Sequence, residues 1–287
     1  MKIAFLVLVH KAPEYVERLA RVLESDGDQI FIHVDKAVDI SSFQIHLSPL
    51  KRSTHLLSRR YAIAWGGFSM IRATNALIEA AVCRGTFDYF CLLSGQCFPI
   101  RPLSWLKQVL AEGLDYINCQ PMPQPSKPMV RLERRMVNVK VTGLGPRGKR
   151  IAEQLLNLIP VQNFQTTFGL APHAGSQWWC LKRETIEHVR NYRLRHPAYD
   201  RFMKWTHIPD EMYYQTLVAN GQAPERITGS LTASVWIQGK ESPEVITRSN
   251  LSGLLRQKVF LARKFQTDDF SLLDELESTS LSASSVN

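Results

Sequence analysis

Two groups of side chains in the carboxyl half have the types and spacing that group transfer from a nucleotide diphosphate requires. Ile208-Pro209-Asp210-Glu211 opens a predicted helix, Asp210–Val218, with two adjacent carboxylates at its amino end. A carboxylate can take the proton from an attacking hydroxyl. Arg248 and Lys264 lie in two separate short segments, and two cations held from different directions could stabilise a leaving diphosphate in place of a metal ion.

Each of these features also has a simpler explanation. Acids at the start of a helix complement its dipole, which is the favoured explanation of Asp210 and Glu211 when they are taken alone. A single exposed cation serves solubility by default. The chemistry therefore depends on whether the fold brings these residues together.

The first hundred residues alternate between strand and helix patterns. Ile3–Val9 is a continuous apolar run, typical of a parallel strand buried on both faces. An amphipathic helix follows Pro13 and ends at Gly27, and Gln29–Val34 is a second strand. A helix at about 69–82 and a strand, Asp88–Leu93, complete a pattern that predicts an α/β fold with a wound, mostly parallel sheet.

Polar residues follow three of these predicted strands. They are His10-Lys11, Asp35-Lys36 and Ser94-Gly95-Gln96. Ligands of such sheets bind beyond the carboxyl ends of the strands. We therefore expect the nucleotide pocket at His10, Asp35, Ser94, Gly95 and Gln96.

The second half mixes both patterns. It predicts strands at Gln177–Leu181 and Val235–Ile237 and a helix at Arg183–Arg193. Because no linker-like stretch divides the chain, we expect one domain over residues 1–275, with a nucleotide-binding part at about 1–120 and an acceptor and catalytic part at about 121–275. The Ser-rich residues 276–287 are expected to be a flexible tail.

Two motif matches are rejected. Asp26-Gly27-Asp28 spells the D-x-D pair that holds a divalent metal in many nucleotide-sugar enzymes, but it precedes a strand and so lies at the wrong edge of the sheet. A turn is the better interpretation. Gly143–Gly148 spells G-x-G-x-x-G, but no acid follows at the spacing that a ribose contact requires, so we interpret it as a mobile loop.

The charge of the chain favours an anionic partner. The net charge is +9, and seven basic residues face one acid between Arg131 and Arg150. This basic segment is either a solvated loop or a contact with a membrane or an acceptor phosphate. A basic protein that binds a polyanion without catalysis is the non-enzyme alternative, although no known nucleic-acid-binding module is present.

The cysteines and the amino terminus bear on location. Five cysteines without a CxxC pair argue against a disulfide framework or a structural zinc site, and Cys83 and Cys91 are expected to be buried thiols. Ile3–Val9 is too short for a bilayer span or a signal peptide. These features predict a cytoplasmic protein, with peripheral contact on the inner face of a membrane as an open alternative.

Taken in order, the motifs resemble the core-2/I-branching β-1,6-N-acetylglucosaminyltransferase family, which is glycosyltransferase family 14 and includes the peptide O-xylosyltransferases. The resemblance is strongest to its short bacterial members. It covers nearly the whole chain and is carried by His10-Lys11, Ile32–Lys36, Trp65–Ser69, Leu92–Gln96 with Phe98-Pro99, Gly175-Ser176, Pro209–Glu211, Trp236, Arg248 and Phe260–Phe265.

The resemblance implies a GT-A type fold and an inverting, metal-independent transfer from a UDP-sugar, with no cofactor. It places the catalytic base on Glu211, the two diphosphate-binding cations on Arg248 and Lys264, and a sugar-stacking residue on Trp236. Asp210 is assigned with Trp236 to the acceptor side, and Asp35 to the uridine.

One departure concerns the donor. Many members of the family carry an acid where this chain has Cys97. N-acetylglucosamine is the expected sugar, with xylose or another hexose as the alternative. The expected acceptor is a glycan hydroxyl, on a lipid carrier if the protein is bacterial.

Overall fold

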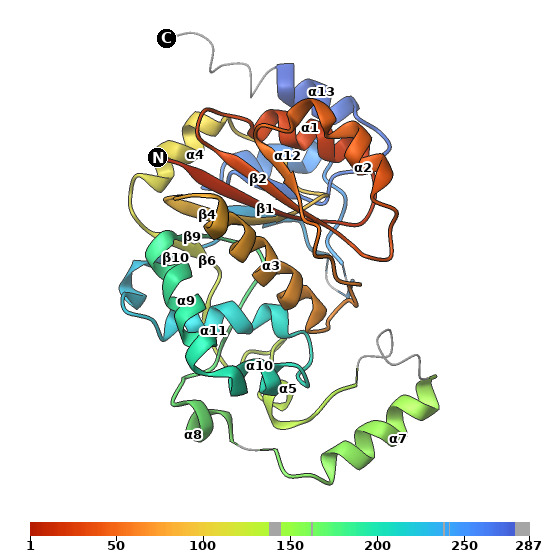
Figure 1. Ribbon diagram of the computed structural model, residues 1–287, viewed down its shortest axis with the longest axis vertical. Helices are drawn as coiled ribbons and strands as arrows, with labels where there is room; N and C mark the ends of the chain where they lie inside the picture. The colour runs from red at the N-terminus through yellow and green to blue at the C-terminus, as the bar shows by residue number, and fades with distance from the viewer. Residues whose placement is uncertain (138–144, 162, 238, 241, 279–287) are drawn as a thin grey trace.

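The protein is an α/β structure built on a seven-stranded sheet (Figure 1). The computed structural model describes residues 1–137, 145–161, 163–237, 239–240 and 242–278. The strands are β1 (Ile3–Val9), β2 (Gln29–Val34), β3 (Thr54–Leu56), β4 (Tyr89–Ser94), β5 (Phe98–Pro99), β6 (Asp115–Ile117), β7 (Gln120–Pro121), β8 (His173–Ala174), β9 (Trp179–Lys182), β10 (Ile227–Thr228), β11 (Thr232–Ser234) and β12 (Leu261–Arg263).

Helices fill the connections between these strands. They are α1 (Pro13–Leu23), α2 (Ser41–His46), η1 (Ser48–Leu50), α3 (Ser69–Arg84), α4 (Leu103–Leu110), α5 (Val130–Glu133), α7 (Pro146–Asn157), α8 (Phe164–Phe168), α9 (Arg183–Arg195), α10 (Pro197–Met203), η2 (Pro209–Glu211), α11 (Tyr213–Ala219), η3 (Pro224–Arg226), α12 (Arg248–Leu255) and α13 (Ser271–Leu276).

The central sheet has the strand order β10-β6-β9-β4-β1-β2-β3. Strands β4, β1, β2 and β3 run parallel, and β9 runs antiparallel to both β4 and β6. The predicted mostly parallel, helix-flanked sheet of a GT-A type fold is therefore confirmed. A strand from the second half of the chain lies between two strands of the first half.

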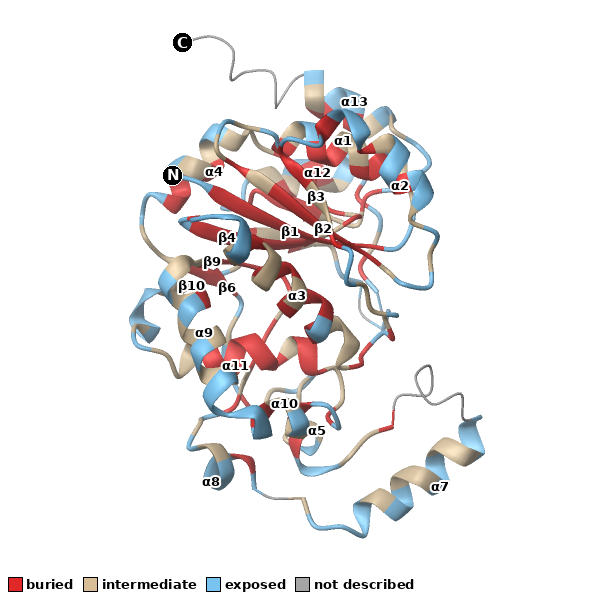
Figure 2. Cartoon of the chain, in the orientation of Figure 1, coloured by how far each residue is buried: buried red, intermediate tan, exposed pale blue. Residues whose placement is uncertain are grey.

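Strand β1 shows why the apolar run at the amino terminus is continuous. Its odd residues, such as Phe5 and Val7, pack in one core with α1, α12 and α13, and its even residues, such as Leu6, pack in a second core with α3, α9 and α11. Figures 1 and 2 show these helices on opposite faces of the sheet, with the strands between them buried. Both faces are covered, so every residue of β1 must be apolar.

Three element predictions differ from the structure. The helix predicted at Asp210–Val218 is two elements, η2 and α11, which are separated at Met212. The strand predicted at Val235–Ile237 is wrong, because the strand is β11, just before it. The tail predicted from residue 276 begins too early, since Leu276 is buried and Glu277 pairs with Arg18 of α1; residues 279–287 lie outside the described part.

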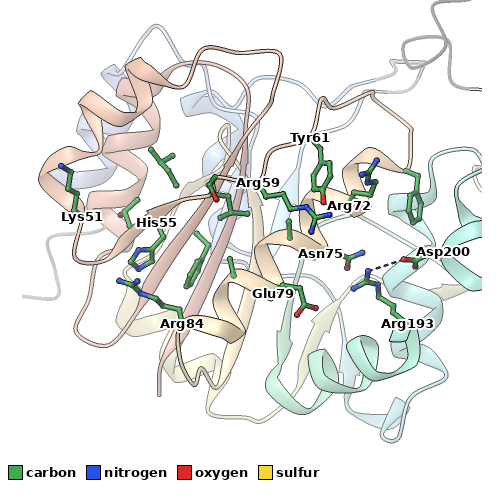
Figure 3. Close-up of a pocket in the computed structure, with 18 residues that line it drawn as sticks. Lys51, His55, Arg59, Tyr61, Arg72, Asn75, Glu79, Arg84, Arg193 and Asp200 are labelled. Carbon is green, nitrogen blue, oxygen red and sulfur yellow. Dashed lines mark hydrogen bonds and ion pairs between the residues drawn. The ribbon is translucent and has the colours of Figure 1, made fainter. Parts of the chain in front are cut away.

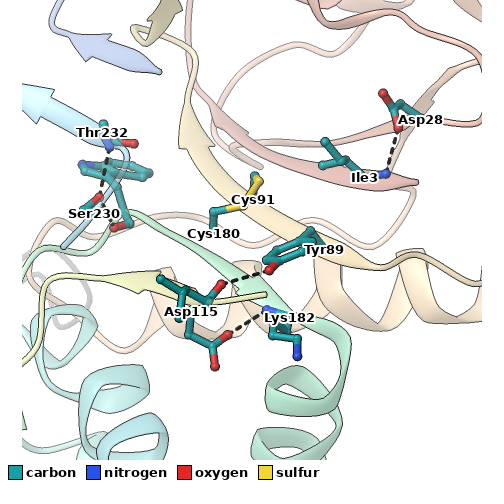
Figure 4. Close-up of a disulfide and its surroundings, with 11 residues drawn as sticks. Ile3, Asp28, Tyr89, Cys91, Asp115, Cys180, Lys182, Ser230 and Thr232 are labelled. Atoms are coloured by element: carbon teal, nitrogen blue, oxygen red, sulfur yellow. Dashed lines mark hydrogen bonds between the residues drawn. A yellow bond between two sulfur atoms is a disulfide. The ribbon is translucent and has the colours of Figure 1, made fainter. Parts of the chain in front are cut away.

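A disulfide joins the two halves of the chain, which corrects the cysteine analysis. Cys91 of β4 and Cys180 of β9 face one another across an antiparallel pair, with their Cα atoms 4.1 Å apart (Figure 4). Cys91 is thus not a free thiol, and Cys83 is exposed rather than buried. The pairing was missed because register between distant strands is not visible in a cysteine count. The prediction of a cytoplasmic location therefore loses one of the observations on which it rested.

The turn interpretation of Asp26-Gly27-Asp28 is confirmed. Gly27 has a φ of +82°. The buried Asp28 carboxylate accepts a bond from the Ile3 amide at 2.8 Å (Figure 4) and also pairs with Lys107 at 2.9 Å. The loop prediction for Gly143–Gly148 is wrong in its second half, because Gly145 caps α7 and Pro146 begins it; residues 143 and 144 lie outside the described part.

Candidate functional site

The carboxyl ends of β1, β2 and β4 lie at one edge of the sheet. Val9 pairs with Val34, and Leu8 pairs with Ser94. The chain stays together beyond the strands, since the Asp35 amide donates to the Val9 carbonyl at 2.8 Å and the Gly95 amide donates to the Leu8 carbonyl at 2.9 Å. The predicted nucleotide residues therefore share one edge, called here the donor edge: His10, Lys11, Asp35 and Ser94–Gln96.

Asp35 has a structural task at this edge. Its carboxylate accepts bonds from the amides of Ala37 at 2.9 Å and Ile63 at 3.3 Å. Next to it, the buried His33 ring accepts a bond from the Tyr61 amide, and burial lowers the pKa of His33 to about 4. The segment around Tyr61 is thus held against the donor edge by a carboxylate and a neutral imidazole.

Gly95 explains why the Ser94–Gln96 turn can lie so close to the sheet. A Cβ at this position would lie 2.8 Å from a methyl carbon of Val9. The turn also holds the next segment, because the Phe265 amide donates to the Gln96 carbonyl at 3.0 Å. Lys264, the residue before Phe265, is therefore placed at the donor edge.

Lys264 is part of a cluster of positive charge. Burial lowers its pKa, and the charges of Arg263 and Lys11 lower it further. Although the His10 side chain is exposed, partial desolvation lowers its pKa, as do the charges of Lys11 and Lys264, while Asp35 opposes them. Lys11, Arg263 and Lys264 are thus three neighbouring cations, and Asp35 is the carboxylate that opposes them. This excess of positive charge favours an anionic ligand at the donor edge.

Arg263 was missed by the sequence analysis. Its guanidinium lies 4.7 Å from the centroid of the Trp178 ring and beside the Cys97 thiol, and burial lowers its pKa. Its Nε has no hydrogen-bond partner among the described residues. The departure at Cys97 was the one signal in the sequence, but nothing there showed that Arg263 lies beside this thiol.

Arg248 lies apart from the donor edge. It begins α12, its side chain is two-thirds exposed, and its Nε pairs with Glu275 at 2.6 Å. It lines a separate cavity of about 350 Å³ near α13. The backbones are closer, because the Ile246 amide donates to the Lys264 carbonyl at 2.8 Å. The structure thus brings the segments of Arg248 and Lys264 together but directs the Arg248 side chain to Glu275.

Glu211 is held in place through both its backbone and its carboxylate. Its carbonyl accepts a bond from the Gly175 amide at 2.8 Å, and a Cβ on Gly175 would overlap the Asn118 carbonyl oxygen. Its Oε2 lies 2.9 Å from Arg131 and 3.7 Å from Lys127. Among the described residues, these two cations are its ion-pair partners, and neither Arg248 nor Lys264 is one of them.

The pairing with Arg131 bears on the basic segment 131–150. Its first residue neutralises the carboxylate of Glu211 instead of facing solvent or a membrane. Sequence reasoning missed this contact because charge counting treats a basic run as one surface. Lys127 was missed because it lies outside this run and belongs to no motif.

Asp210 differs from its neighbour. It is buried, and burial together with the charge of Glu211 raises its pKa to about 7. Its Oδ1 has no hydrogen-bond partner among the described residues. By contrast, the Glu211 side chain is 30% exposed, so Glu211 is the acid of this pair that is open to solvent.

Two tryptophans lie near these groups. Trp236 is 60% exposed and follows β11, whose Ser234 pairs with Arg263 of β12. Trp65 is 61% exposed and precedes Gly66, whose carbonyl accepts a bond from the Ile208 amide just before η2. The segments that carry these tryptophans are thus linked through the backbone to segments that carry site residues. The roles assigned to Trp236, Asp210 and the other site residues stay predictions.

No helix in the described part of the chain combines the length and the apolar character needed to cross a bilayer.

Comparison with curated proteins gives distant relatives. Over 240 residues the chain is 22% identical to the bovine β-1,3-galactosyl-O-glycosyl-glycoprotein β-1,6-N-acetylglucosaminyltransferase, covering 81% of this chain and 51% of that protein. Over 232 residues it is 25% identical to rat xylosyltransferase 1, covering 77% of this chain and 26% of that protein. The chain thus spans about half or less of the curated relatives it matches.

Among solved structures, mouse xyloside xylosyltransferase 1 in its apo form aligns with a TM-score of 0.41 and 8% identity, over 91% of this chain and 97% of that chain. The model of the Core-2/I-Branching enzyme family matches residues 3–258, which is most of the sequence. This match shows that the chain belongs to the Core-2/I-Branching enzyme family.

Proposed function

We propose that the protein transfers a sugar from a UDP-sugar to a glycan hydroxyl with inversion, without a metal ion and with Glu211 as the base. The observation that carries the proposal is the contrast between Glu211 and Asp210. Glu211 is partly exposed and its carboxylate position is fixed by Arg131, whereas Asp210 is buried. A positioned carboxylate next to an open side is what deprotonation of an acceptor requires.

The donor edge supplies the other half of the reaction. Lys264, with Lys11 and Arg263 beside it, stabilises the diphosphate as its charge grows, in the role that a divalent metal has in other enzymes. Arg248 joins it when its pair with Glu275 opens. Trp236 stacks on the acceptor sugar, and Asp210 supports the acceptor side.

The bonds change in one displacement. The acceptor oxygen attacks the anomeric carbon from the face opposite UDP, and its proton passes to the Glu211 carboxylate. The bond from the anomeric carbon to the diphosphate oxygen breaks, and its electron pair leaves with UDP. An α-linked donor thus gives a β-linked product.

Glu211→Gln tests the base. We expect turnover to fall about 10²–10⁴-fold while UDP binding stays unchanged. Glu133→Gln is the matched control, because Glu133 is an exposed acid of α5 and makes the same change of charge. Turnover of Glu211→Gln at the level of this control would refute the assignment.

The diphosphate site has its own test. Lys264→Ala and Arg248→Ala should both weaken UDP binding and lower turnover, by about 10²–10³-fold for a cation at the developing charge. Lys258→Ala, which removes an exposed lysine paired with Glu112, should change neither. Activity that EDTA abolishes and a divalent metal restores would contradict the metal-free mechanism.

The donor sugar is proposed to be N-acetylglucosamine, and xylose is the main alternative. The curated relatives named above divide between these two transfers by their names. Release of UDP from UDP-N-acetylglucosamine, UDP-xylose, UDP-glucose and UDP-galactose distinguishes them directly.

We also infer that the protein works at the surface of an anionic membrane, where a lipid-linked acceptor would lie. The inference rests on α7, none of whose 12 residues is buried. Figure 2 shows this helix away from the body of the protein. Its polar side faces the chain, since the Val137 amide donates to Glu153 and Asn157 bonds to Arg135.

The outer side of α7 is apolar. Ile151 and Leu155, one helical turn apart on one face of α7, are 58% and 61% exposed, and Leu158 and Ile159, just beyond its last residue, are 77% and 54% exposed. Arg147 and Arg150 are also exposed. An apolar stripe with flanking arginines that points away from the protein suits acyl chains and phosphate headgroups.

Vesicle sedimentation tests this surface. The protein should bind phosphatidylglycerol vesicles more strongly than phosphatidylcholine vesicles, and Leu155→Glu should abolish the binding. Leu194→Glu, at an exposed leucine on α9, is the control. Unchanged binding of Leu155→Glu, or a dimer that this substitution dissociates, would show that α7 has another partner.

A further inference from the structure

We propose that a cationic groove between β3, α3 and α9 is a second anion site, separate from the donor edge, which binds a phosphoryl or pyrophosphoryl group. The groove encloses about 820 Å³. Figure 3 shows Lys51, His55 and Arg84 toward one end of it and Arg59, Tyr61 and Arg72 toward the other.

The charges that line this groove are unbalanced. Five are cationic, namely Lys51, Arg59, Arg72, Arg84 and Arg193, and two are acidic, namely Glu79 and Asp200. Both acids are already engaged, because Glu79 pairs with Arg190 at 2.6 Å and Asp200 pairs with Arg193 at 3.4 Å. Four cations are thus left without a carboxylate partner in the part of the chain that the structure describes.

Tyr61 lies beside two of these cations. The guanidinium carbon of Arg72 lies 4.4 Å from the centroid of the Tyr61 ring, and that of Arg59 lies 5.6 Å from the same centroid. Two guanidinium groups beside one aromatic ring concentrate positive charge, which favours an anion nearby. Their planar donors match the paired oxygens of a phosphate.

The Tyr61 ring cannot move freely, which makes this arrangement a formed site rather than two mobile side chains. The Tyr61 amide donates to His33 at 2.9 Å, its carbonyl accepts from the Lys36 amide at 3.0 Å, and its ring stacks on the His33 ring. These contacts fix the ring that positions Arg59 and Arg72.

The floor between the two ends is less polar. Leu56, Ala76 and Ala80 line it and are partly exposed. A ligand with an apolar portion next to its phosphoryl group would therefore gain contacts that inorganic pyrophosphate cannot make. The groove suits a phosphorylated ligand from either of two sources, a free anion or a lipid-linked substrate.

The groove and the donor edge are distinct sites that share a wall. Asp35 at the donor edge accepts the Ile63 amide, and Arg60 donates to the Asp35 and Val38 carbonyls. Residues 59–63 thus bond to the donor edge and carry Arg59 and Tyr61 of the groove. A ligand in the groove can bind while UDP occupies the donor edge.

Calorimetric titration with inorganic pyrophosphate, in the presence of saturating UDP, tests the proposal. We expect binding that UDP does not prevent and that Arg59→Gln/Arg72→Gln weakens about a hundredfold, or roughly tenfold for each guanidinium removed. UDP binding by this variant should stay unchanged. Arg226→Gln is the control, because Arg226 is exposed beside β10, at the opposite edge of the sheet from β3.

Two results would overturn the proposal: no pyrophosphate binding once UDP is bound, or an equal loss in Arg226→Gln, which would mean non-specific attraction. Geranyl pyrophosphate distinguishes the sources. Tighter binding than pyrophosphate supports a lipid-linked ligand, and equal binding supports a free anion. If UDP fails to bind at all, the proposed sugar transfer is refuted. The same pyrophosphate titration without UDP then still tests whether the groove binds an anion.

Discussion

The buried acid next to the proposed base makes a measurable prediction about stability. Burial and the charge of Glu211 raise the pKa of Asp210 from 3.8 to about 7. Well below pH 3.8 the carboxyl is protonated in both the folded and the unfolded chain, so its ionisation has no effect on stability. Between pH 4 and pH 7 the unfolded chain releases the proton and the folded chain keeps it, so the free energy of unfolding falls as pH rises.

The size of the effect follows from the shift. One pKa unit corresponds to about 1.4 kcal/mol, so the difference between 3.8 and about 7 corresponds to about 4 kcal/mol once both states are ionised. Asp210→Asn removes the ionisation. The quantity to measure is the free energy of unfolding of the variant minus that of the original protein. We expect this difference to be about 4 kcal/mol larger at pH 8 than at pH 4.

Urea unfolding followed by circular dichroism at several values between pH 4 and pH 8 measures this difference. The new amide can also change the free energy of unfolding by a constant amount at every pH. Such a constant change would not alter how the free energy of unfolding depends on pH. Asp268→Asn, at an exposed acid, is the control and should change stability by less than about 0.5 kcal/mol throughout. Parallel pH curves for Asp210→Asn and the original protein would refute the reasoning.

Two further substitutions test the frame around the site. Gly175→Ala should lower both turnover and stability, because its Cβ would lie 1.6 Å from the Asn118 carbonyl oxygen and the Gly175 amide holds Glu211. Gly229→Ala, where a Cβ meets nothing within 4 Å, should lower neither. Activity assays and thermal unfolding compare the two variants. Cys91→Ala/Cys180→Ala should lower the free energy of unfolding by about 2–4 kcal/mol in non-reducing buffer, and the difference from the original protein should vanish when a reductant opens the bond. A stability difference that persists in reductant would mean that packing, not the crosslink, is responsible.

The sequence predicted best where one local pattern determined the structure. Strand β2 has the predicted limits, Gln29–Val34, because a short apolar run between polar neighbours has few alternatives. The positions of His10, Asp35 and Ser94 at one edge followed from the parallel order of three strands. These are consequences of periodicity and of a general rule for wound sheets.

What the sequence could not show depends on pairing between distant segments. The Arg131 contact with Glu211 spans 80 residues, and the Cys91–Cys180 bond spans 89. Neither is visible without the register of strands that meet only in the folded chain. The direction of the Arg248 side chain toward Glu275 depends on α13, whose position a motif does not specify. The groove at Tyr61 was missed because its cations come from several elements and form no motif.

The place of β9 in the sheet has a consequence for how the protein is made. Strand β4 is complete once residue 94 has been synthesised, but the neighbour that covers its outer edge is formed by residues 179–182. At a bacterial or eukaryotic ribosome adding about 5–20 residues per second, that edge waits several seconds for its partner. An apolar strand with unpaired amide and carbonyl groups attracts other strands during such a wait. Newly made chains should therefore depend on chaperones at this stage, and truncations that end between β4 and β9 should aggregate.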